Sequence, residues 1–513
     1  MKKIKSFFLI LFVLITALMF AVIFINAKPK QVELKVEVFE RSLPGYKGDD
    51  NYWTKWIQKN FGDPNNIKVK FVPVPRSEEI NKLNILMASN DAPDIVFTYN
   101  YETVYNYVKL GGLTDLTKLV DKHGKNLKKF LGTDVLERGS FEGKQYLIPA
   151  RRILTGCFGA FIRKDWLDKL GLPVPKTRDE LYKTLKAFKE KDPGNVGKDR
   201  VIPLALDLNI QNVTWSSRLL IDTFVEPMDF TKEHSTLLWY KPGFKEGIRF
   251  LNKMYNEGLI SPDFALDKDS KILEKDTAQG RVGFLMQNYD FPYRTSPGLA
   301  LELKKNVPGG EFVPVDSFAN AKGKTRKRMY DPTGLFIMVP KSSKRAVEAI
   351  KYLEWMSDPK VMDFLVNGEK GTNYKEYQDG IPINIPIEGE KRLTMDIAII
   401  VNGKDFGNID KNITALSLGY APEFKDYIKK AYKQSITADV PYYELSFPIA
   451  SAAKYAKSIL EKDNEIFVKS LTCKPADFDG VFDKLVKEHY DLYAKEVMAD
   501  RLAYIKKNYK NKK

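Results

Sequence analysis

The chain has 513 residues, of which 43% are hydrophobic, 12% aromatic and 29% charged, and its formal net charge is +16. This length and composition exclude a disordered or collagen-like chain and favour a folded protein of two or more domains. Lysines are scattered beside acidic residues, which indicates a solvated surface rather than a nucleic-acid-binding face, although the basic excess also suits an anionic ligand. We therefore expect no nucleic-acid partner.

The first 27 residues predict a targeting segment. The basic start "MKKIKS" precedes an apolar run over 7–25, which is long for a signal peptide and about long enough to cross a bilayer. The basic end stays inside, so the rest of the chain is expected at the outer face of the cytoplasmic membrane. The run ends without a cysteine, which argues against a lipoprotein anchor. Cleavage after Ala27 and an uncleaved anchor both stay open.

Three strands and two helices are predicted between residues 31 and 97. Alternating apolar and polar residues favour strands, and apolar residues spaced three or four apart favour helices. The strands are expected over 31–39, 67–74 and 94–97, and the helices over 52–59 and 77–91. This β-α-β-α-β order predicts a parallel sheet.

Tyrosines gather directly after the third of these strands. Tyr99 and Tyr101 follow it at once, and ligands in α/β sheets bind beyond the carboxyl ends of strands. Tyr105 and Tyr107 lie farther along the next helix and are expected to pack against the core. Tyr99 and Tyr101 are therefore candidate ligand contacts, with packing beneath that helix as the alternative.

The rest of the chain continues the α/β pattern. Residues 139–150 predict a hairpin and an extended segment that crosses between domains. Farther on, the sequence predicts a helix capped near Thr177, a helix ending at Gly258, strands over 280–291 and 332–340, a helix over 342–359 and a helical tail from Phe478.

The densest basic run is "KGKTRKR" at 322–328. It contains "GKT", but Phe318 stands where a phosphate-binding loop has its first glycine. We expect a basic surface turn there.

Several spans carry a family resemblance: "ASNDAPDIVFTYN…VKLGGLTDLTKLV", "FEGKQYLIPA", "IRKDWLDKLGLPVPKTRDELYKTLKAF", "FKEGIRFLNKMYNEGLISPDF", "GRVGFLM" and "KSSKRAVEAIKYLEWMSDP…GEKGTNY". Each is weak alone, but together they cover most of the chain after residue 31 in one consistent order. In that order they resemble the extracellular solute-binding proteins of bacterial ABC importers, the sugar-binding class that includes maltose-binding protein. The resemblance points to the larger LipO-like and alginate-binding branch of this class.

The resemblance implies a two-lobe α/β fold of the type II periplasmic-binding-protein kind, with a hinge of crossing segments and a ligand cleft between the lobes. A sugar has apolar C–H faces and a hydroxyl rim, and tyrosine suits both. The division that we expect is a targeting segment over 1–27, an N-terminal lobe over 31–149 and 330–410, and a C-terminal lobe over 150–329 that a helical region over 411–513 completes.

Arginines at the crossing segment are candidates for ligand recognition. Arg151 and Arg152 are adjacent, so in an extended chain one should face the cleft and the other should face away. A guanidinium group offers a planar fork to a carboxylate or to paired hydroxyls. Because the resemblance includes binders of acidic sugars, an acidic oligosaccharide is among the expected ligands, and a structural ion pair is the alternative role.

Further candidates follow other predicted strands and loops. Each has packing or a structural contact as its alternative, and none is fixed by a motif. They are Arg41 in the first Gly/Pro loop, Trp215 where this class often places a stacking aromatic, Asn288 and Tyr289 after "GFLMQ", and Tyr330 and Asp331 before "GLFIMVP".

The sequence departs from the resembled branch at a calcium loop. Calcium needs several oxygen donors at alternate positions of such a loop. In "DPGNVGKDRVIP", Asp192 is retained, but Gly194, Val196 and Arg200 occupy donor positions. We expect no calcium, with Arg200 supplying positive charge in its place, and no other metal or cofactor.

The sequence motifs give little support to an enzymatic function. The three histidines are scattered, and HExxH, paired CxxC and GxSxG are absent from the sequence. The expected function is therefore that of a monomeric, exported, non-enzymatic protein that captures an oligosaccharide and delivers it to an ABC permease. A polysaccharide-processing enzyme with a facing carboxylate pair and a ligand sensor of the same fold are the alternatives.

Overall fold

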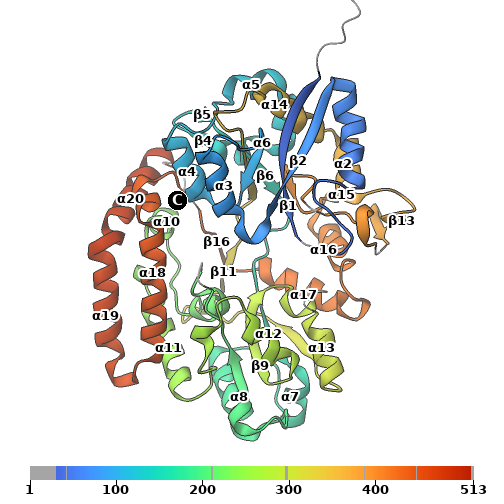
Figure 1. The fold of residues 1–513 in the computed structure, drawn as a ribbon. Coiled ribbons are helices and arrows are strands. Elements are labelled where there is room, and N and C mark those ends of the chain that lie inside the picture. Colours follow the sequence, from blue (N-terminus) through green and yellow to red (C-terminus); the bar gives the residue numbers. More distant parts are fainter. Residues whose placement is uncertain are drawn as a thin grey trace, which may run out of the picture.

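The computed structural model describes residues 31–509, apart from Ser42, 210–211, 295–297, Pro386, Met395 and Ser446. The predicted targeting segment lies outside the described residues. Within the part of the chain that is described, none of the helices is both long and apolar enough to cross a bilayer. Figure 1 shows two lobes, one above the other, with the last helices along one side.

The upper lobe of Figure 1 is built on a four-stranded sheet in the order β15-β6-β12-β3. Beside it lies the parallel pair of β1 and β2, which Ile95 joins to the sheet through a parallel bridge to Val36. The predicted parallel arrangement of the first three strands is thus confirmed. The complete sheet is mixed, because β12 returns late in the chain and pairs antiparallel with both β3 and β6. The strands are β1 (Val32–Glu40), β2 (Ile67–Pro75), β3 (Val96–Thr98), β6 (Leu147–Arg152), β12 (Thr333–Met338) and β15 (Val401–Asn402).

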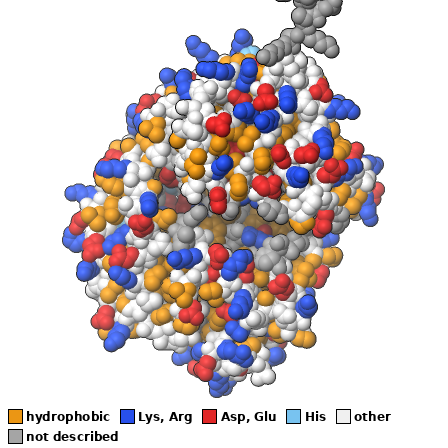
Figure 2. All heavy atoms as spheres, viewed as in Figure 1, with side chains coloured by type: hydrophobic (Ala, Val, Ile, Leu, Met, Phe, Trp, Pro, Cys, Tyr) orange, Lys and Arg blue, Asp and Glu red, His pale blue; other side chains and the backbone are white. Residues whose placement is uncertain are grey.

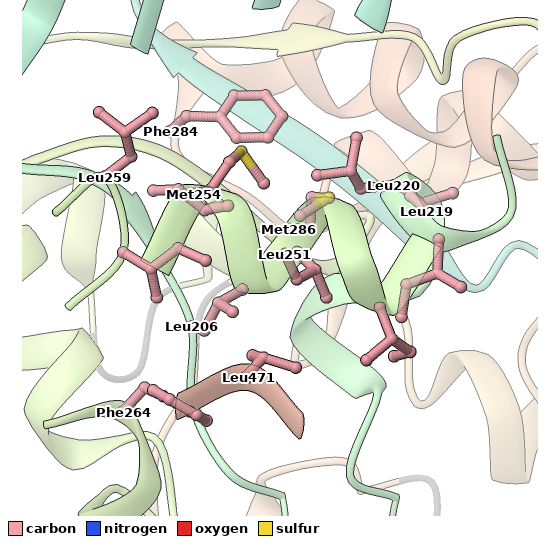
Figure 3. Packing of buried hydrophobic residues seen from close by; sticks show 14 of the residues in the cluster. Leu206, Leu219, Leu220, Leu251, Met254, Leu259, Phe264, Phe284, Met286 and Leu471 are labelled. Carbon is pink, nitrogen blue, oxygen red and sulfur yellow. The ribbon is translucent and has the colours of Figure 1, made fainter. Parts of the chain in front are cut away.

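The lower lobe holds a second four-stranded sheet, in the order β10-β7-β9-β8. Its strands are β7 (Phe158–Arg163), β8 (Ile202–Ala205), β9 (Val282–Asn288) and β10 (Phe312–Val315). The amphipathic helix α11 (Phe244–Asn256) covers this sheet. Figure 3 shows Leu251 and Met254 of α11 packed among Phe284 and Met286 of β9 and Leu471 from the C-terminal region. Each lobe thus has a hydrophobic core of its own.

Helices surround both sheets. Those that pack on the upper lobe are α2 (Tyr52–Ile57), α3 (Glu79–Ala88), α4 (Tyr101–Lys109), α5 (Thr117–His123), α6 (Lys125–Leu136), α14 (Ala346–Met356) and α15 (Pro359–Asn367). Those of the lower lobe are α7 (Lys164–Leu170), α8 (Arg178–Lys191), α9 (Arg218–Ile221), α10 (Phe230–Ser235), α12 (Lys271–Ala278) and α13 (Leu299–Asn306), with α16 (Ile409–Ser417) and α17 (Lys425–Ile436) following later in the chain. Thr177 caps α8 by accepting a hydrogen bond from the Glu180 N–H, as predicted.

Three small strand pairs complete the sheets. The predicted hairpin at 139–150 is confirmed as β4 (Ser140–Phe141) and β5 (Lys144–Gln145), and a second hairpin joins β13 (Tyr374–Gln378) to β14 (Ile381–Asn384). The third pair is parallel and lies between the lobes: β11 (Arg326–Met329) pairs with β16 (Val440–Tyr443).

The C-terminal helices contact both lobes. α18 (Ala450–Thr472) packs against α11 of the lower lobe and α4 of the upper lobe. α19 (Phe478–His489) and α20 (Lys495–Asn508) follow it, and α20 packs against α10. In Figure 1 these helices run in red along one edge of the molecule, and the chain ends near α4.

The predicted basic surface turn at 322–328 is wrong for its last three residues. Arg326 and Lys327 are each only 2% exposed because they belong to β11. Arg326 donates two hydrogen bonds to the Glu233 carboxylate, at 2.7 and 2.8 Å, and Lys241 pairs with the same carboxylate. Burial of these cations is possible because each has a carboxylate partner from a distant part of the chain.

We predict that Glu233→Gln destabilises the protein strongly. The change leaves Arg326 and Lys241 buried without their shared carboxylate, and losing one partner of a buried pair costs about 3–5 kcal/mol. Urea unfolding followed by circular dichroism measures the loss. The matched control is Glu226→Gln, which removes an exposed pair with Lys322 and should cost about 0–1 kcal/mol. Equal unfolding midpoints for the two variants would contradict the role of the buried cluster.

Candidate functional site

A cavity of about 460 Å³ lies where the lobes meet, and we call it the interlobe cavity. The ends of β3, β6 and the start of β12 supply one side of it. The residues after β11 and β16 and the end of α20 supply the other. Its wall includes Tyr99, Tyr101, Asp134, Arg138, Arg152, Arg328, Tyr330, Asp331, Glu444, Leu445, Tyr504 and Tyr509.

Five of the predicted site residues line this cavity: Tyr99, Tyr101, Arg152, Tyr330 and Asp331. They come from three separate stretches of sequence, which follow β3, end β6 and join β11 to β12. The structure therefore gathers half of the predicted set around one cavity. Whether they bind a ligand is taken up below.

The orientation of the Tyr99 ring is fixed by its neighbours. Its ring stacks on Phe39 at 6.2 Å between centroids, and the Arg76 guanidinium lies 4.9 Å from its centroid. Its hydroxyl accepts a hydrogen bond of 3.4 Å from the Asn402 amide. Burial raises the pKa of Tyr99 above its ordinary value, so the hydroxyl stays a neutral donor and acceptor at the cavity wall.

Tyr330 is fixed in the same way from the other side. The Arg152 guanidinium lies 4.8 Å from its ring centroid, and Trp215 lies 6.5 Å away. The hydroxyl of Tyr330 donates a hydrogen bond of 3.0 Å to Asn288 Oδ1. Arg152 also donates from Nε to the Thr333 carbonyl at 3.3 Å, and it makes no ion pair with any described carboxylate.

The side chains of Asp331 and Tyr101 are more constrained by their contacts than those of Tyr99 and Tyr330. The Asp331 carboxylate is ion-paired with Arg138 and accepts hydrogen bonds from the Thr333 N–H and hydroxyl at 2.9 and 2.7 Å. Tyr101 is only 7% exposed, with its ring stacked on Phe141 at 5.8 Å. Tyr105 and Tyr107 are buried, which confirms their predicted packing role.

The other five predicted residues do not line the cavity. Arg41 forms a bidentate pair with Asp396, and Arg151 turns away to the Phe130 carbonyl and Asp134. Trp215 packs on Phe158 at 4.7 Å, and Tyr289 makes an edge-to-face contact with Tyr432 at 4.9 Å. Asn288 reaches the site only through the Tyr330 hydroxyl.

Sequence reasoning missed the wall that β11, β16 and α20 supply. Arg328 belongs to the basic run that was predicted to be a surface turn, and Glu444 directly follows β16, a strand that the pattern did not predict. Tyr504 and Tyr509 lie in the predicted helical tail, but nothing in "AYIKKNY" indicates that it folds back between the lobes.

Two other cavities were not anticipated. A cavity of about 340 Å³, which we call the polar cavity, shares Arg328, Glu444 and Leu445 with the interlobe cavity. A larger one of about 680 Å³ is lined only by residues between Leu365 and Lys404, so it lies within the upper lobe. Burial lowers the pKa of Lys404 in its wall to about 8.

A buried carboxyl group supports the strand that carries Tyr99. Glu37 on β1 is 1% exposed and accepts a hydrogen bond of 3.1 Å from the Phe97 N–H. Its other oxygen, Oε1, is buried without a partner among the described residues. Burial raises the pKa of Glu37 from 4.5 to about 8, so the group is largely protonated at neutral pH.

The segment that departs from a calcium loop has a compact turn. The Asp192 carboxylate accepts hydrogen bonds from the Val196 and Gly197 N–H groups at 3.0 and 2.8 Å, and the Arg200 N–H donates to the Gly197 carbonyl. In the described ranges, no group of three or more His, Cys, Asp or Glu side chains is arranged to hold a metal ion. The absence of calcium remains a prediction.

Comparisons with known proteins assign the chain to a family. A model of the bacterial extracellular solute-binding protein family matches residues 45–363. The chain belongs to this family. Among curated relatives, this solute-binding protein is 30% identical over 330 residues to lipoprotein LipO of Bacillus subtilis (strain 168), covering 61% of the chain and 62% of LipO. It is 28% identical over 228 residues to the polygalacturonan/rhamnogalacturonan-binding protein YtcQ of the same strain, covering 44% of each.

Solved structures show the same two-lobe fold. FusA of S. pneumoniae, an ABC-transporter substrate-binding protein in complex with kestose, has a TM-score of 0.67 at 19% identity and covers 94% of this chain and all of its own. The alginate-binding protein AlgQ2 without calcium ion has a TM-score of 0.62 at 20% identity, covering 92% and 98%. These likenesses establish the type II periplasmic-binding-protein fold. The chain spans less than two thirds of the length of LipO and of YtcQ.

We predict that Glu37 makes stability depend on pH. Between pH 4.5 and about 8 the folded chain holds a proton on Glu37 that the unfolded chain has lost, so the free energy of unfolding falls as pH rises. This fall is at most about 1.4 kcal/mol per pH unit. Glu37→Gln removes it, so the variant should gain stability relative to the parent across this window, measured by urea unfolding.

The control is Glu33→Gln, on the same strand with its side chain 41% exposed. Its stability difference from the parent should stay flat over the same pH range. A flat difference for Glu37→Gln as well would show that Glu37 is ionised in the folded protein.

Proposed function

We propose that this protein is the extracellular substrate-binding component of an ABC importer and that it captures an oligosaccharide in the interlobe cavity. The proposal rests on one observation above all: two tyrosine rings, Tyr99 packed against the core of the upper lobe and Tyr330 packed against the core of the lower lobe, are held in fixed orientations by cations and aromatic neighbours in the wall of one cavity. Rigid aromatic faces with polar rims suit sugar rings. Family membership and the names of the relatives support the same function.

The ligand contacts proposed are Tyr99, Tyr101, Arg152, Tyr330 and Asp331. Trp215 and Asn288 would then position Tyr330 rather than touch the ligand. Tyr289, Arg41 and Arg151 would support the surrounding framework through the contacts described above. Ligand that bridges both lobes stabilises their closed arrangement, because only that arrangement offers both sets of contacts.

A binding role fits the wall of the cavity better than hydrolysis. Glycoside hydrolysis needs two carboxyl groups free to act on one bond. Three of the four carboxylates in this wall are instead held in ion pairs: Asp331 with Arg138, Glu444 with Arg218 and Arg328, and Asp134 with Arg151. Among the described residues of the wall, this leaves Glu137 as a single carboxylate outside an ion pair. Curated relatives are binding proteins, and we infer that this chain has no catalytic activity.

The expected cellular setting follows from family membership in extracellular solute-binding proteins. We propose that residues 1–27 export the chain and either stay as an anchor or are cleaved, and that the monomer delivers its ligand to an ABC permease. We also propose that the lobes divide as the sequence predicts, with 31–149 and 330–410 forming one lobe and 150–329 and 411–513 forming the other.

We predict that Tyr99→Ala and Tyr330→Ala each weaken sugar binding by about 2 kcal/mol or more, since central aromatic anchors dominate such sites. A thermal-shift panel of kestose, raffinose, oligogalacturonates and alginate oligomers selects the ligand, and calorimetry measures affinity. Tyr377→Ala, which removes a tyrosine 42% exposed on β13, is the control and should bind like the parent.

Affinities of both variants within about 0.5 kcal/mol of the parent, with folding intact, would contradict the site, because that is no more than an ordinary surface substitution costs. Product analysis of the same mixtures tests the enzymatic alternative. A cleaved sugar would overturn the assignment as a binding protein.

A further inference from the structure

The polar cavity adjoins the interlobe cavity and is unusually rich in charge. Its lining includes four cations, Arg218, Lys241, Arg328 and Arg501, and four acidic residues, Glu102, Glu233, Glu444 and Asp463. Because Arg328, Glu444 and Leu445 line both cavities, the two cavities are direct neighbours. Together the two volumes lie within the range of small-ligand sites.

Two carboxylates of this region, those of Glu444 and Glu233, are each shared between two cations. Glu444 pairs with both Arg218 and Arg328, at 3.1 and 2.8 Å. Although burial raises the pKa of Glu444, these arginines lower it to about 2, so the group is fully ionised. Glu233 likewise serves Lys241 and Arg326 together, and Asp222 lies 3.7 Å from Arg326.

Two other charged groups of the lining, Asp463 and Arg501, are not shared in this way. Asp463 accepts a hydrogen bond from Trp239 Nε1, and burial raises the pKa of Asp463 to about 7, so it carries only part of a charge at neutral pH. Arg501 on α20 makes no ion pair with any described carboxylate, and its Nε is buried without a hydrogen-bond partner. Burial lowers the pKa of Arg501, and Glu102 and Glu444 offset this only in part.

Arg328 has unused donors in the same cavity. One terminal nitrogen pairs with Glu444, but Nε and Nη1 are buried and make no hydrogen bond within the described structure. Buried donors without partners are costly, and charged ones more so. Arg328 and Arg501 therefore line one cavity with buried guanidinium donors that have no hydrogen-bond partner among the described residues.

We propose that the ligand is an acidic oligosaccharide and that Arg328 and Arg501 bind one of its carboxylates in the polar cavity. This rests on the proposed function, with the sugar chain continuing from the polar cavity to Tyr99 and Tyr330. A carboxylate fits the planar guanidinium fork and brings a single negative charge, whereas a phosphate monoester brings nearly two.

The test compares trigalacturonate with the same trisaccharide after reduction of its carboxyl groups, by calorimetry at low salt. The parent should bind trigalacturonate at least about tenfold more tightly, as expected for charge-assisted hydrogen bonds, and added sodium chloride should reduce this preference. Equal binding of the two trisaccharides by the parent overturns the inference without any variant.

The Arg501→Gln variant tests whether Arg501 causes the preference for trigalacturonate over the reduced trisaccharide. It should weaken trigalacturonate binding about tenfold or more and leave the reduced trisaccharide within about twofold. The control is Arg249→Gln, which removes an arginine 42% exposed and paired with Asp479 away from both cavities, and it should change neither affinity. Loss of both trisaccharides equally, or of neither, in folded Arg501→Gln overturns the assignment.

Two further measurements separate a failure of this inference from a failure of the proposed function. The first adds sodium sulfate at matched ionic strength. If sulfate displaces trigalacturonate in an Arg501-dependent way and binds as tightly as trigalacturonate does, the site binds a free inorganic anion and the inference is wrong. If neutral sugars bind in a Tyr99-dependent way but trigalacturonate does not bind, the inference fails and the proposed function stands. If no sugar of the panel binds, the proposed function fails too.

Discussion

The strand pair β11–β16 depends on the ion pairs that its arginines make with buried Glu233 and partly exposed Glu444, and the interlobe cavity depends on that strand pair. Arg326 and Arg328 alternate along β11 with Lys327, and each finds a carboxylate from a distant segment. Tyr330 follows β11 directly and Glu444 follows β16, so the ion pairs fix one whole side of the cavity. Isolated buried charges are too costly to survive, so the fold is specified here by charge matching as much as by apolar packing.

Cation and aromatic contacts give the cavity its shape. The Arg76 guanidinium lies about equally close to the Tyr99 ring and to the Phe39 ring on which Tyr99 stacks, and Tyr330 lies beside Arg152 and Trp215. Such contacts restrict the rings before any ligand arrives, and a prearranged site loses less conformational freedom on binding. Figure 2 shows basic and acidic side chains interspersed over the outer face of both lobes, so the net charge of +16 is not gathered into one patch on that face.

Local pattern predicted much of the fold but little of the charged interior. Strands β1, β2, β9 and β12 and the cap of α8 follow from periodicity and capping residues, which act over a few positions. The burial of Arg326 and Lys327 does not, because their partners Glu233 and Asp316 lie outside any local window. Tyr99 and Tyr330 could be predicted because they lie at the ends of strands that the local pattern indicates. Arg501 and Tyr504 could not, because only the fold-back of α20 brings them to the cavities.

The position of α20 bears on where tags, fused domains and dyes can be attached to this protein. Tyr504 and Tyr509 form part of the interlobe wall, and Tyr509 is the last residue that the structure describes. A purification tag or fluorescent domain fused after residue 513 is therefore joined to the chain only a few residues beyond this wall. An environment-sensitive dye coupled beside Tyr509 would sense a guest molecule in the cavity directly.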